Sequence, residues 1–207
     1  MLSLLFSNPL AFFILFPGLL LSITVHEFAH ALAADKLGDP TPRQQGRVTL
    51  NPLAHLDPLG TLAMLLTRFG WGRPVQFDPY NLKNPLRDTA LIALAGPVSN
   101  VVIALVLTLL VRTVFIDSAL LTVVASQIIG LNIILALFNL VPVYPLDGSK
   151  ILLALLPRNL AYEYESFMNR YGIFVLLLLI FPWAGGMSPV SQLISPLINT
   201  VMMLLLG

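Results

Sequence analysis

Long apolar stretches constrain this chain more than any other feature of its sequence. The stretch from about Pro9 to Leu37, which ends at the stop signal Gly38-Asp39-Pro40, exceeds the roughly 20 apolar residues that a helix needs to cross a bilayer. Further apolar stretches run from about Thr89 to Phe115 and from about Leu120 to Leu140. Because 57% of the 207 residues are hydrophobic and 10% are charged, we expect an all-α polytopic membrane protein.

The loop after the first span is more polar and less regular. Residues 38–87 include a strand-like piece, Arg47 to Leu50, and an apolar piece, Leu59 to Phe69, that is too short to cross a bilayer comfortably. We therefore expect a small β-like element and a re-entrant or interfacial helix in this loop. A short helix is expected later in the chain, from Ser149 to Leu156.

Two shorter apolar stretches make up the expected C-terminal helices, residues 171–206. They follow a polar piece, Pro157 to Arg170, and flank a turn-like piece, Ala184 to Ser188, so they have the pattern of a helical hairpin. The sequence thus predicts roughly five to six transmembrane or re-entrant helices in a single membrane-embedded domain over residues 1–207.

The basic residues are unevenly distributed around the expected spans. Seven of the eleven lie within residues 36–87, and only Arg112 lies near the outer face. Because Lys and Arg gather in cytoplasmic loops, we expect the end of the first span and the end of the third at the cytoplasmic side. The net charge of +1 and the lack of a basic patch argue against nucleic-acid binding. Without cysteine, only His, Asp, Glu or Asn could hold a metal.

The segment His26-Glu27-Phe28-Ala29-His30 matches the pattern H-E-x-x-H inside the first expected span. Residues four apart face the same side of a helix, so both imidazoles can bind one metal ion while Glu27 lies beside it. The alternative is a pair of core histidines. Ionisable side chains at membrane depth are costly, however, and normally mark a functional cluster. We therefore predict a metal site with His26 and His30 as ligands.

A catalytic zinc ion commonly has three protein ligands and an open position, so the two histidines need a partner. The best candidate is Asp147, which follows the third span in a segment where Pro142 and Pro145 break the helix. Spacing alone favours an ordinary turn aspartate before Gly148. The shared cytoplasmic side of the two span ends favours a ligand instead.

The segment His26 to His30 and the segment Asn139 to Gly148 together resemble the two motifs of the site-2 protease family, the zinc intramembrane metalloproteases of peptidase family M50. The resemblance covers most of the chain and is closest to the compact prokaryotic branch without a PDZ domain. It implies that His26, His30 and Asp147 hold one zinc ion and that Glu27 is the catalytic base. It also suggests a transmembrane protein as substrate and a prokaryotic cell membrane as location, with the active site toward the cytoplasm.

Two further segments resemble this branch. Residues 95–100, Ala-Gly-Pro-Val-Ser-Asn, are similar to its Gly-Pro-x-x-Asn element, although a plain proline kink explains them equally well. The second segment, residues 51–58, carries His55. This residue is either a solvated loop histidine or a catalytic helper that hydrogen-bonds the substrate carbonyl or acts as an alternative ligand. Asn139 is a second candidate for polarising that carbonyl or holding the substrate backbone.

These residues predict peptide hydrolysis in which Glu27 takes a proton from the attacking water and delivers it to the leaving amine. A substrate helix hides its peptide bonds and must unwind before attack, and Arg47 to Leu50 is a candidate for pairing with the extended chain. The alternatives are a membrane metal-ion transporter and a catalytically silent membrane adaptor. Neither has the same chemical need for Glu27. The sequence leaves the oligomeric state open.

Overall fold

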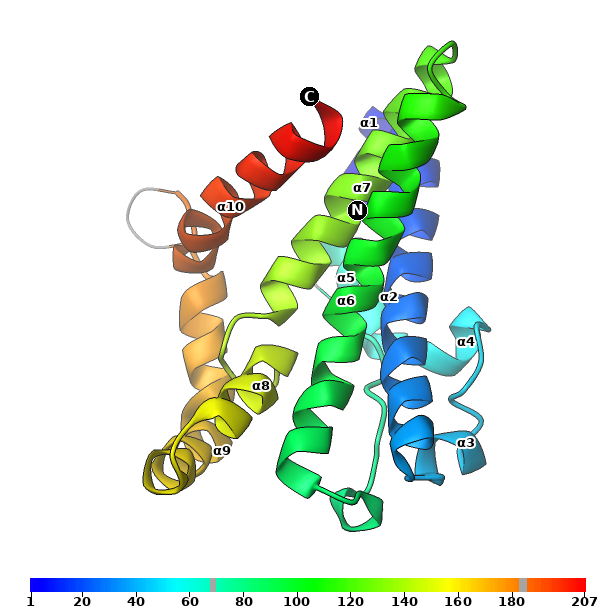
Figure 1. The fold of residues 1–207 in the computed structure, drawn as a ribbon. Coiled ribbons are helices and arrows are strands. Elements are labelled where there is room, and N and C mark those ends of the chain that lie inside the picture. Colours follow the sequence, from blue (N-terminus) through cyan, green and yellow to red (C-terminus); the bar gives the residue numbers. More distant parts are fainter. Residues whose placement is uncertain (68–69, 183–185) are drawn as a thin grey trace.

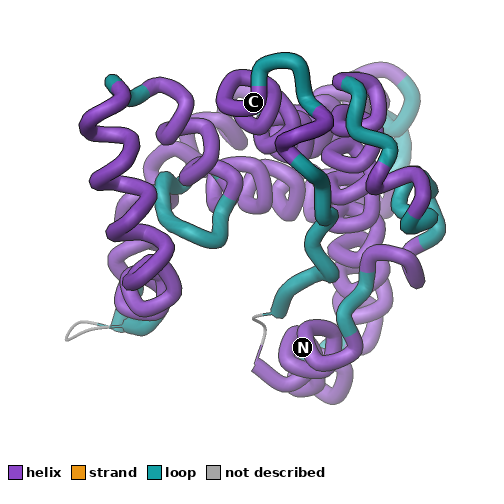
Figure 2. Tube along the Cα trace, turned by 90° about the horizontal axis from the view of Figure 1, so that it is seen from below, coloured by secondary structure: helices purple, strands orange, loops and turns teal. Residues whose placement is uncertain are grey.

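The computed structural model describes residues 1–67, 70–182 and 186–207, and these residues form helices and no β-strand (Figures 1 and 2). The all-α architecture predicted from the sequence is confirmed. The helices are α1 (Leu2–Ser7), α2 (Pro9–Leu37), α3 (Thr41–Gln44), α4 (Pro52–His55), α5 (Pro58–Thr67), η1 (Pro79–Asn81), α6 (Pro85–Thr113), α7 (Ala119–Asn139), α8 (Asp147–Leu155), α9 (Arg158–Ile180) and α10 (Pro189–Leu206), of which η1 is a 3-10 helix.

The β-like element expected from Arg47 to Leu50 is wrong. This segment is irregular, and the β-type pairing within the described residues is an isolated bridge between Leu56 and Gly72. The Arg47 backbone N–H donates to the carbonyl of Pro42 and its guanidinium donates to the carbonyl of Arg73. These bonds connect Arg47 to Pro42 and to Arg73, and no strand of the described residues lies beside the segment.

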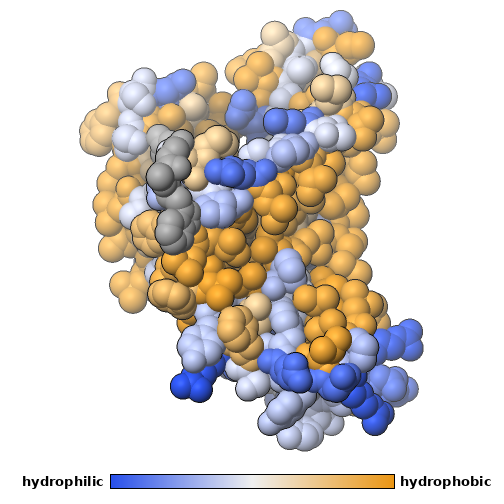
Figure 3. All heavy atoms as spheres, turned by 90° about the vertical axis from the view of Figure 1, so that its left-hand side faces the viewer, coloured by the Kyte–Doolittle hydropathy of each residue, from blue (hydrophilic) through white to orange (hydrophobic). Residues whose placement is uncertain are grey.

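Four helices among the described residues are long and apolar enough to cross a bilayer: α2, α6, α7 and α10. The chain is therefore an integral membrane protein. Helix α2 has the predicted bounds. It begins at Pro9, where the preceding Asn8 side chain accepts a hydrogen bond from the Ala11 N–H, and it ends at Gly38, whose φ of 113° is left-handed. Figure 3 shows apolar residues covering the middle of one face, with hydrophilic residues gathered toward its ends.

The remaining helices differ more from the expectation. Helix α5 starts one residue before the expected segment 59–69 and covers it to Thr67, while residues 68 and 69 lie outside the described part of the chain. Helix α9 starts at Arg158, so the polar piece from Pro157 to Arg170 and the apolar stretch after it belong largely to one continuous helix. Residues 184 and 185 of the expected turn 184–188 also lie outside the description.

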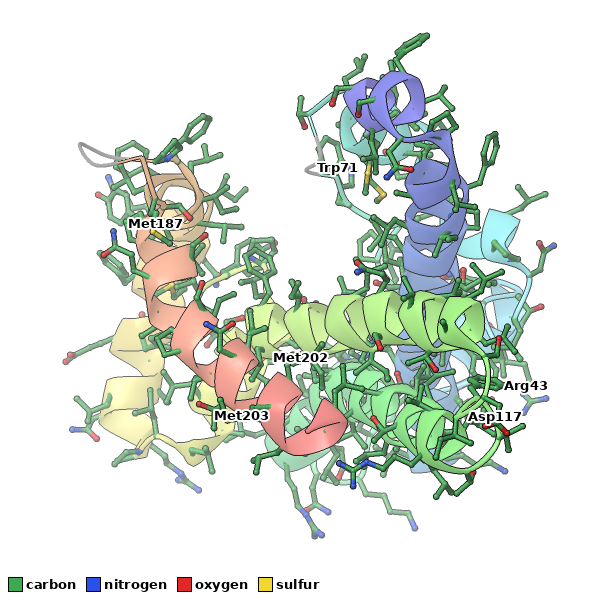
Figure 4. All side chains as sticks on the ribbon, turned by 90° about the horizontal axis from the view of Figure 1, so that it is seen from above. Arg43, Trp71, Asp117, Met187, Met202 and Met203 are labelled. Carbon is green, nitrogen blue, oxygen red and sulfur yellow. The ribbon has the colours of Figure 1, made fainter. Side chains whose placement is uncertain are left out.

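Helix α6 is central to the arrangement, because it packs against α2, α7 and α8. Seen from above, α2 with α1 and α5 forms one arm of the molecule and α9 with α10 forms the other, while α7 crosses between them (Figure 4). Ala104 of α6 and Ile129 and Ile133 of α7 form a buried core, against which side chains of α10 pack. The C-terminal end of α2, the N-terminal end of α6 and helix α8 lie at the same end of the molecule (Figure 1).

Candidate metal centre

His26 and His30 lie one turn apart on the same face of α2. Their ring centroids are 4.6 Å apart, and the two planes meet at 86°. Both side chains are buried, with exposed fractions of 6% and 7%. The predicted helical spacing therefore brings two imidazoles to one point, deep in a helix that is long enough to span the membrane.

Asp147 comes to this point from the other end of the sequence. Helix α7 ends at Asn139, and the segment with Pro142 and Pro145 leads to Asp147, the first residue of α8. One carboxylate oxygen of Asp147, Oδ2, lies 3.1 Å from Nε2 of His26 and 3.2 Å from Nε2 of His30. His26 and Asp147, which are 121 residues apart in the sequence, thus meet in the fold.

The other nitrogen of each imidazole faces a carbonyl oxygen. Nδ1 of His26 lies 2.6 Å from Oδ1 of Asn100, and Nδ1 of His30 lies 2.7 Å from the backbone oxygen of Ile92. Both oxygens can only accept, so each Nδ1 carries the proton of the bond. In the neutral rings this leaves the Nε2 lone pairs directed at Asp147. Metal-binding histidines typically donate their second N–H in this way.

The three converging atoms fit a zinc ion. One ligand atom from each of His26, His30 and Asp147 lies within 4.8 Å of the other two. A tetrahedral zinc ion with ligand distances of about 2.0–2.1 Å holds its ligand atoms about 3.3 Å apart, close to the 3.1 and 3.2 Å found between Nε2 and Oδ2. Two imidazoles and a carboxylate are also a donor set that zinc favours.

Helix α6 approaches the two rings so closely that only glycine fits at position 96. A Cβ atom there would lie 2.4 Å from Nε2 of His30 and 2.6 Å from Nε2 of His26. Helix α6 continues through Pro97, and Asn100, one turn after Gly96, contacts His26. The segment 95–100 is therefore more than a proline kink, because both its glycine and its asparagine contact the candidate ligands.

Glu27 lies beside the cluster and lines the same small cavity of about 100 Å³. Its carboxylate accepts a hydrogen bond of 3.1 Å from the backbone N–H of Val75. Asn139 and Lys150 also line this cavity, and the Lys150 ammonium lies 5.3 Å from the centroid of the Phe77 ring. The Asn139 side-chain amide donates to the backbone carbonyl of Leu135 in its own helix. The cavity thus combines a candidate base, an amide and a cation next to the three ligand atoms.

A second and larger cavity of about 540 Å³ adjoins the first and shares Glu27 and Asn139 with it. Its walls are mainly apolar. Trp71, in the segment between α5 and α6, is one of the residues that line it (Figure 4). We call it the apolar groove. Its other apolar side chains include Leu19 and Ile23 of α2, Met64 of α5, and Leu131, Leu135 and Phe138 of α7.

His55 lies elsewhere. It is fully buried in α4, and its Nε2 pairs with the carbonyl of Thr49 at 2.7 Å while its own carbonyl accepts from the Arg73 N–H. Burial lowers the pKa of His55, and the neighbouring Arg47 lowers it further, which outweighs the opposing hydrogen bond to Thr49. It lines neither cavity in the described part of the chain, so its predicted assistance to the reaction remains a prediction.

Several groups around the centre were not predicted from the sequence. The carbonyl of Ile92 and the N–H of Val75 are backbone groups, which no residue type announces. Asn132 and Ser22, which bond to Asn100 behind His26, were also missed. A buried asparagine inside an apolar span is the one signal that would have identified Asn132.

Fold and site together define a class: an integral membrane protein with a buried His-His-Asp cluster, suited to a metal ion, and a glutamate beside it. Comparisons with known proteins narrow this class. Residues 116–179, which include Asp147, match the model of peptidase family M50. The candidate zinc metalloprotease YwhC of Bacillus subtilis is 38% identical over 189 residues, which cover 87% of this chain and 84% of YwhC. The chain therefore belongs to peptidase family M50, a family of zinc metalloproteases, as the two motifs predicted.

More distant relatives agree with this assignment. The candidate zinc metalloprotease Rip2 of Mycolicibacterium smegmatis is 31% identical over 144 residues, which cover 66% of this chain and 55% of Rip2. Zinc metalloprotease MJ0392 of Methanocaldococcus jannaschii is 29% identical over 157 residues, which cover 75% of this chain and 38% of MJ0392. None of the solved structures matches this chain.

Proposed function

We propose that this protein is an intramembrane zinc metalloprotease that hydrolyses peptide bonds in transmembrane segments of other proteins. His26, His30 and Asp147 hold one zinc ion, and Glu27 is the general base. The observation that carries the proposal is the meeting of these ligands beside Glu27 inside a bundle of membrane-spanning length. Membership in a zinc metalloprotease family supports the choice of metal and of reaction.

A bound zinc ion would act as a Lewis acid and lower the pKa of water at its open position toward about 7. Glu27 accepts the proton of the attacking water, because its carboxylate lines the cavity next to the ligands. The same carboxyl group then delivers this proton to the leaving amine. Asn139 serves as a hydrogen-bond donor to the substrate carbonyl or backbone after it turns away from the Leu135 carbonyl.

The apolar groove supports a substrate that is itself apolar. Because it opens into the cavity at Glu27 and Asn139, an extended peptide in the groove has its backbone next to the candidate base. A transmembrane helix must unwind locally to enter it, since its peptide bonds are otherwise internally paired. We place the site toward the cytoplasmic side of a prokaryotic cell membrane. Most basic residues gather at the end of the spans where the site lies, and Lys and Arg gather in cytoplasmic loops.

The proposal is tested by comparing the unmodified protein, Glu27→Gln and a matched control, Glu163→Gln, after purification in detergent. Glu163 lies on α9, is exposed, and lines neither cavity. Each protein is incubated with a panel of tagged single-span membrane proteins, cleavage is followed by mass spectrometry, and zinc is quantified by atomic absorption. We expect about one zinc ion per chain in all three proteins and at least about a 100-fold slower cleavage for Glu27→Gln alone.

Two outcomes would count against the proposal. Cleavage by Glu27→Gln at the rate of the control would remove Glu27 as the base. Zinc flux into liposomes that survives Glu27→Gln, without cleavage of any panel member, would instead support a metal-ion transporter.

A further inference from the structure

Three polar side chains meet behind His26, away from both cavities. Ser22 of α2, Asn100 of α6 and Asn132 of α7 have exposed fractions of 3%, 0% and 0%. They lie where the three spanning helices pack together, in surroundings where an unpaired polar group is costly. The mechanism proposed above gives no role to Asn132 or Ser22.

The orientation of the Asn132 amide is fixed by its own helix. Its Nδ2 donates to the backbone carbonyl of Ile128 at 2.9 Å and to Oγ of Ser22 at 3.0 Å. A carbonyl can only accept, so the nitrogen must lie on this side and Oδ1 must face Asn100. Nδ2 of Asn100 donates to this oxygen at 2.8 Å and, over a longer distance of 3.3 Å, to the backbone carbonyl of Ser22. The Asn100 nitrogen is therefore held by these two acceptors, of which Asn132 makes the shorter bond, and its Oδ1 faces Nδ1 of His26 at 2.6 Å.

The two candidate ligands differ in how their Nδ1 proton is held. His30 faces the backbone carbonyl of Ile92, which presents only an oxygen. His26 faces a side-chain amide, which can present either its oxygen or its NH₂ group after a half-turn. If the NH₂ group of Asn100 faced Nδ1, the neutral ring would carry its proton on Nε2. That nitrogen is the one directed at Asp147, and it would then have no lone pair for a metal.

We propose that Asn132 is a positioning residue of the metal centre. By holding the Asn100 amide in one orientation, it keeps the proton of the neutral His26 ring on Nδ1 and leaves Nε2 free to bind the metal. This inference rests on the proposed zinc site and adds a residue of α7 that contacts no ligand directly. Outer groups of this kind typically change metal affinity about 10- to 100-fold.

The test measures Co²⁺ binding to the chelator-treated full-length protein in detergent, with the visible d–d absorption as a readout of the coordination geometry. Asn132→Leu removes the amide at similar volume, and we expect about a 10- to 100-fold weaker affinity and an altered absorption band. Asn132→Asp is expected to bind within about threefold of the unmodified protein. A carboxyl group at position 132 keeps an oxygen that accepts from Nδ2 of Asn100, so the orientation of the Asn100 amide is preserved.

Thr108→Val is the matched control. Thr108 is a buried polar residue of α6 whose hydroxyl donates to the Ala104 carbonyl. It takes no part in the relay, by which we mean the hydrogen bonds from Asn132 through Asn100 to His26. A double variant separates a relay from a general packing effect. If Asn132 acts through Asn100, then Asn132→Leu adds nothing to the loss already caused by Asn100→Leu. If Asn132→Leu does not give monodisperse protein, Asn132→Ala replaces it with the same expected loss.

Unchanged affinity in Asn132→Leu or Asn132→Ala, an equal loss in Asn132→Asp, or full additivity in the double variant would overturn the inference about Asn132 alone. An unmodified protein that binds neither Co²⁺ nor zinc would overturn the metal site itself, and the relay with it. The two failures are therefore distinguishable.

Discussion

Replacing Gly96 with alanine should disable the metal centre with a single methyl group. The added Cβ would lie 2.4 Å from Nε2 of His30 and 2.6 Å from Nε2 of His26, whereas ordinary contacts begin at 3.4 Å. The two contacts therefore fall short of an ordinary contact distance by 3.4 − 2.4 = 1.0 Å and 3.4 − 2.6 = 0.8 Å. Either the rings or helix α6 must move by about this amount. Metal–ligand distances tolerate only about 0.2 Å, so the ligands cannot move this far and still coordinate well.

We expect zinc affinity to fall at least about 100-fold, which corresponds to about 2.8 kcal/mol. This lower bound is similar in size to the roughly 1–3 kcal/mol of folding stability that overpacking a protein interior typically costs. The affinity is measured by competition with a fluorescent zinc chelator in detergent, and thermal unfolding is recorded for each variant.

Gly130→Ala is the matched control for this substitution. Gly130 also lies in a spanning helix, α7, but its added Cβ would make an ordinary 3.6 Å contact with Met202. This control should bind zinc normally and unfold at an equal or higher temperature, because alanine favours helix by about 1 kcal/mol relative to glycine. If Gly96→Ala bound zinc within about threefold of Gly130→Ala, the close approach of α6 to the rings would be refuted.

Two further predictions concern carboxylates. Asp147→Asn should weaken zinc binding at least about 10-fold without loss of helicity, since an amide is a poorer zinc ligand than a carboxylate. The exposed turn residue Asp117 supplies the control, Asp117→Asn (Figure 4), and zinc binding by Asp147→Asn as tight as by this control would contradict the prediction. Asp39 is fully buried, and although burial alone would raise its pKa, hydrogen bonds from Thr41, Asn81 and the Asp78 N–H lower it. Its stabilising effect is therefore present above the ordinary aspartate pKa of about 3.9 and is lost as pH falls below it. Thermal unfolding between about pH 6 and 3 should show a smaller acid destabilisation in Asp39→Asn, and identical pH profiles would refute this role.

The bounds of α2 and the approach of Asp147 to His26 and His30 were predictable because each follows from a strong local signal. A long apolar run bounded by Pro9 and Gly38 leaves few alternatives to a spanning helix. The distribution of Lys and Arg fixes which helix ends meet, and it thereby brings two distant motifs together. The other spanning helices were predicted by the same reasoning, but their ends were predicted less accurately, since capping decides where a helix ends.

The incorrect predictions have physical causes that local patterns do not contain. Arg47 to Leu50 has a β-like composition, but a strand needs a partner, and here the guanidinium of Arg47 bonds to the Arg73 carbonyl. No helix was predicted from the sequence for the polar piece from Pro157 to Arg170. In the fold it is the first half of α9, because half of a helix can lie in water while the other half continues into apolar surroundings. The groups that orient His30 and Glu27 belong to the backbone of Ile92 and Val75, so no residue type could have indicated them.

The separation of the ligands along the chain has a consequence for biosynthesis. His26 emerges from the ribosome long before Asp147. The two become neighbours only when helices α2, α6 and α7 have inserted and packed against one another. A nascent chain that has inserted only its early spans therefore carries two of the three candidate ligands and no complete centre. The proposed hydrolytic activity is therefore acquired late, when the assembled helices can also restrict which chains reach the site.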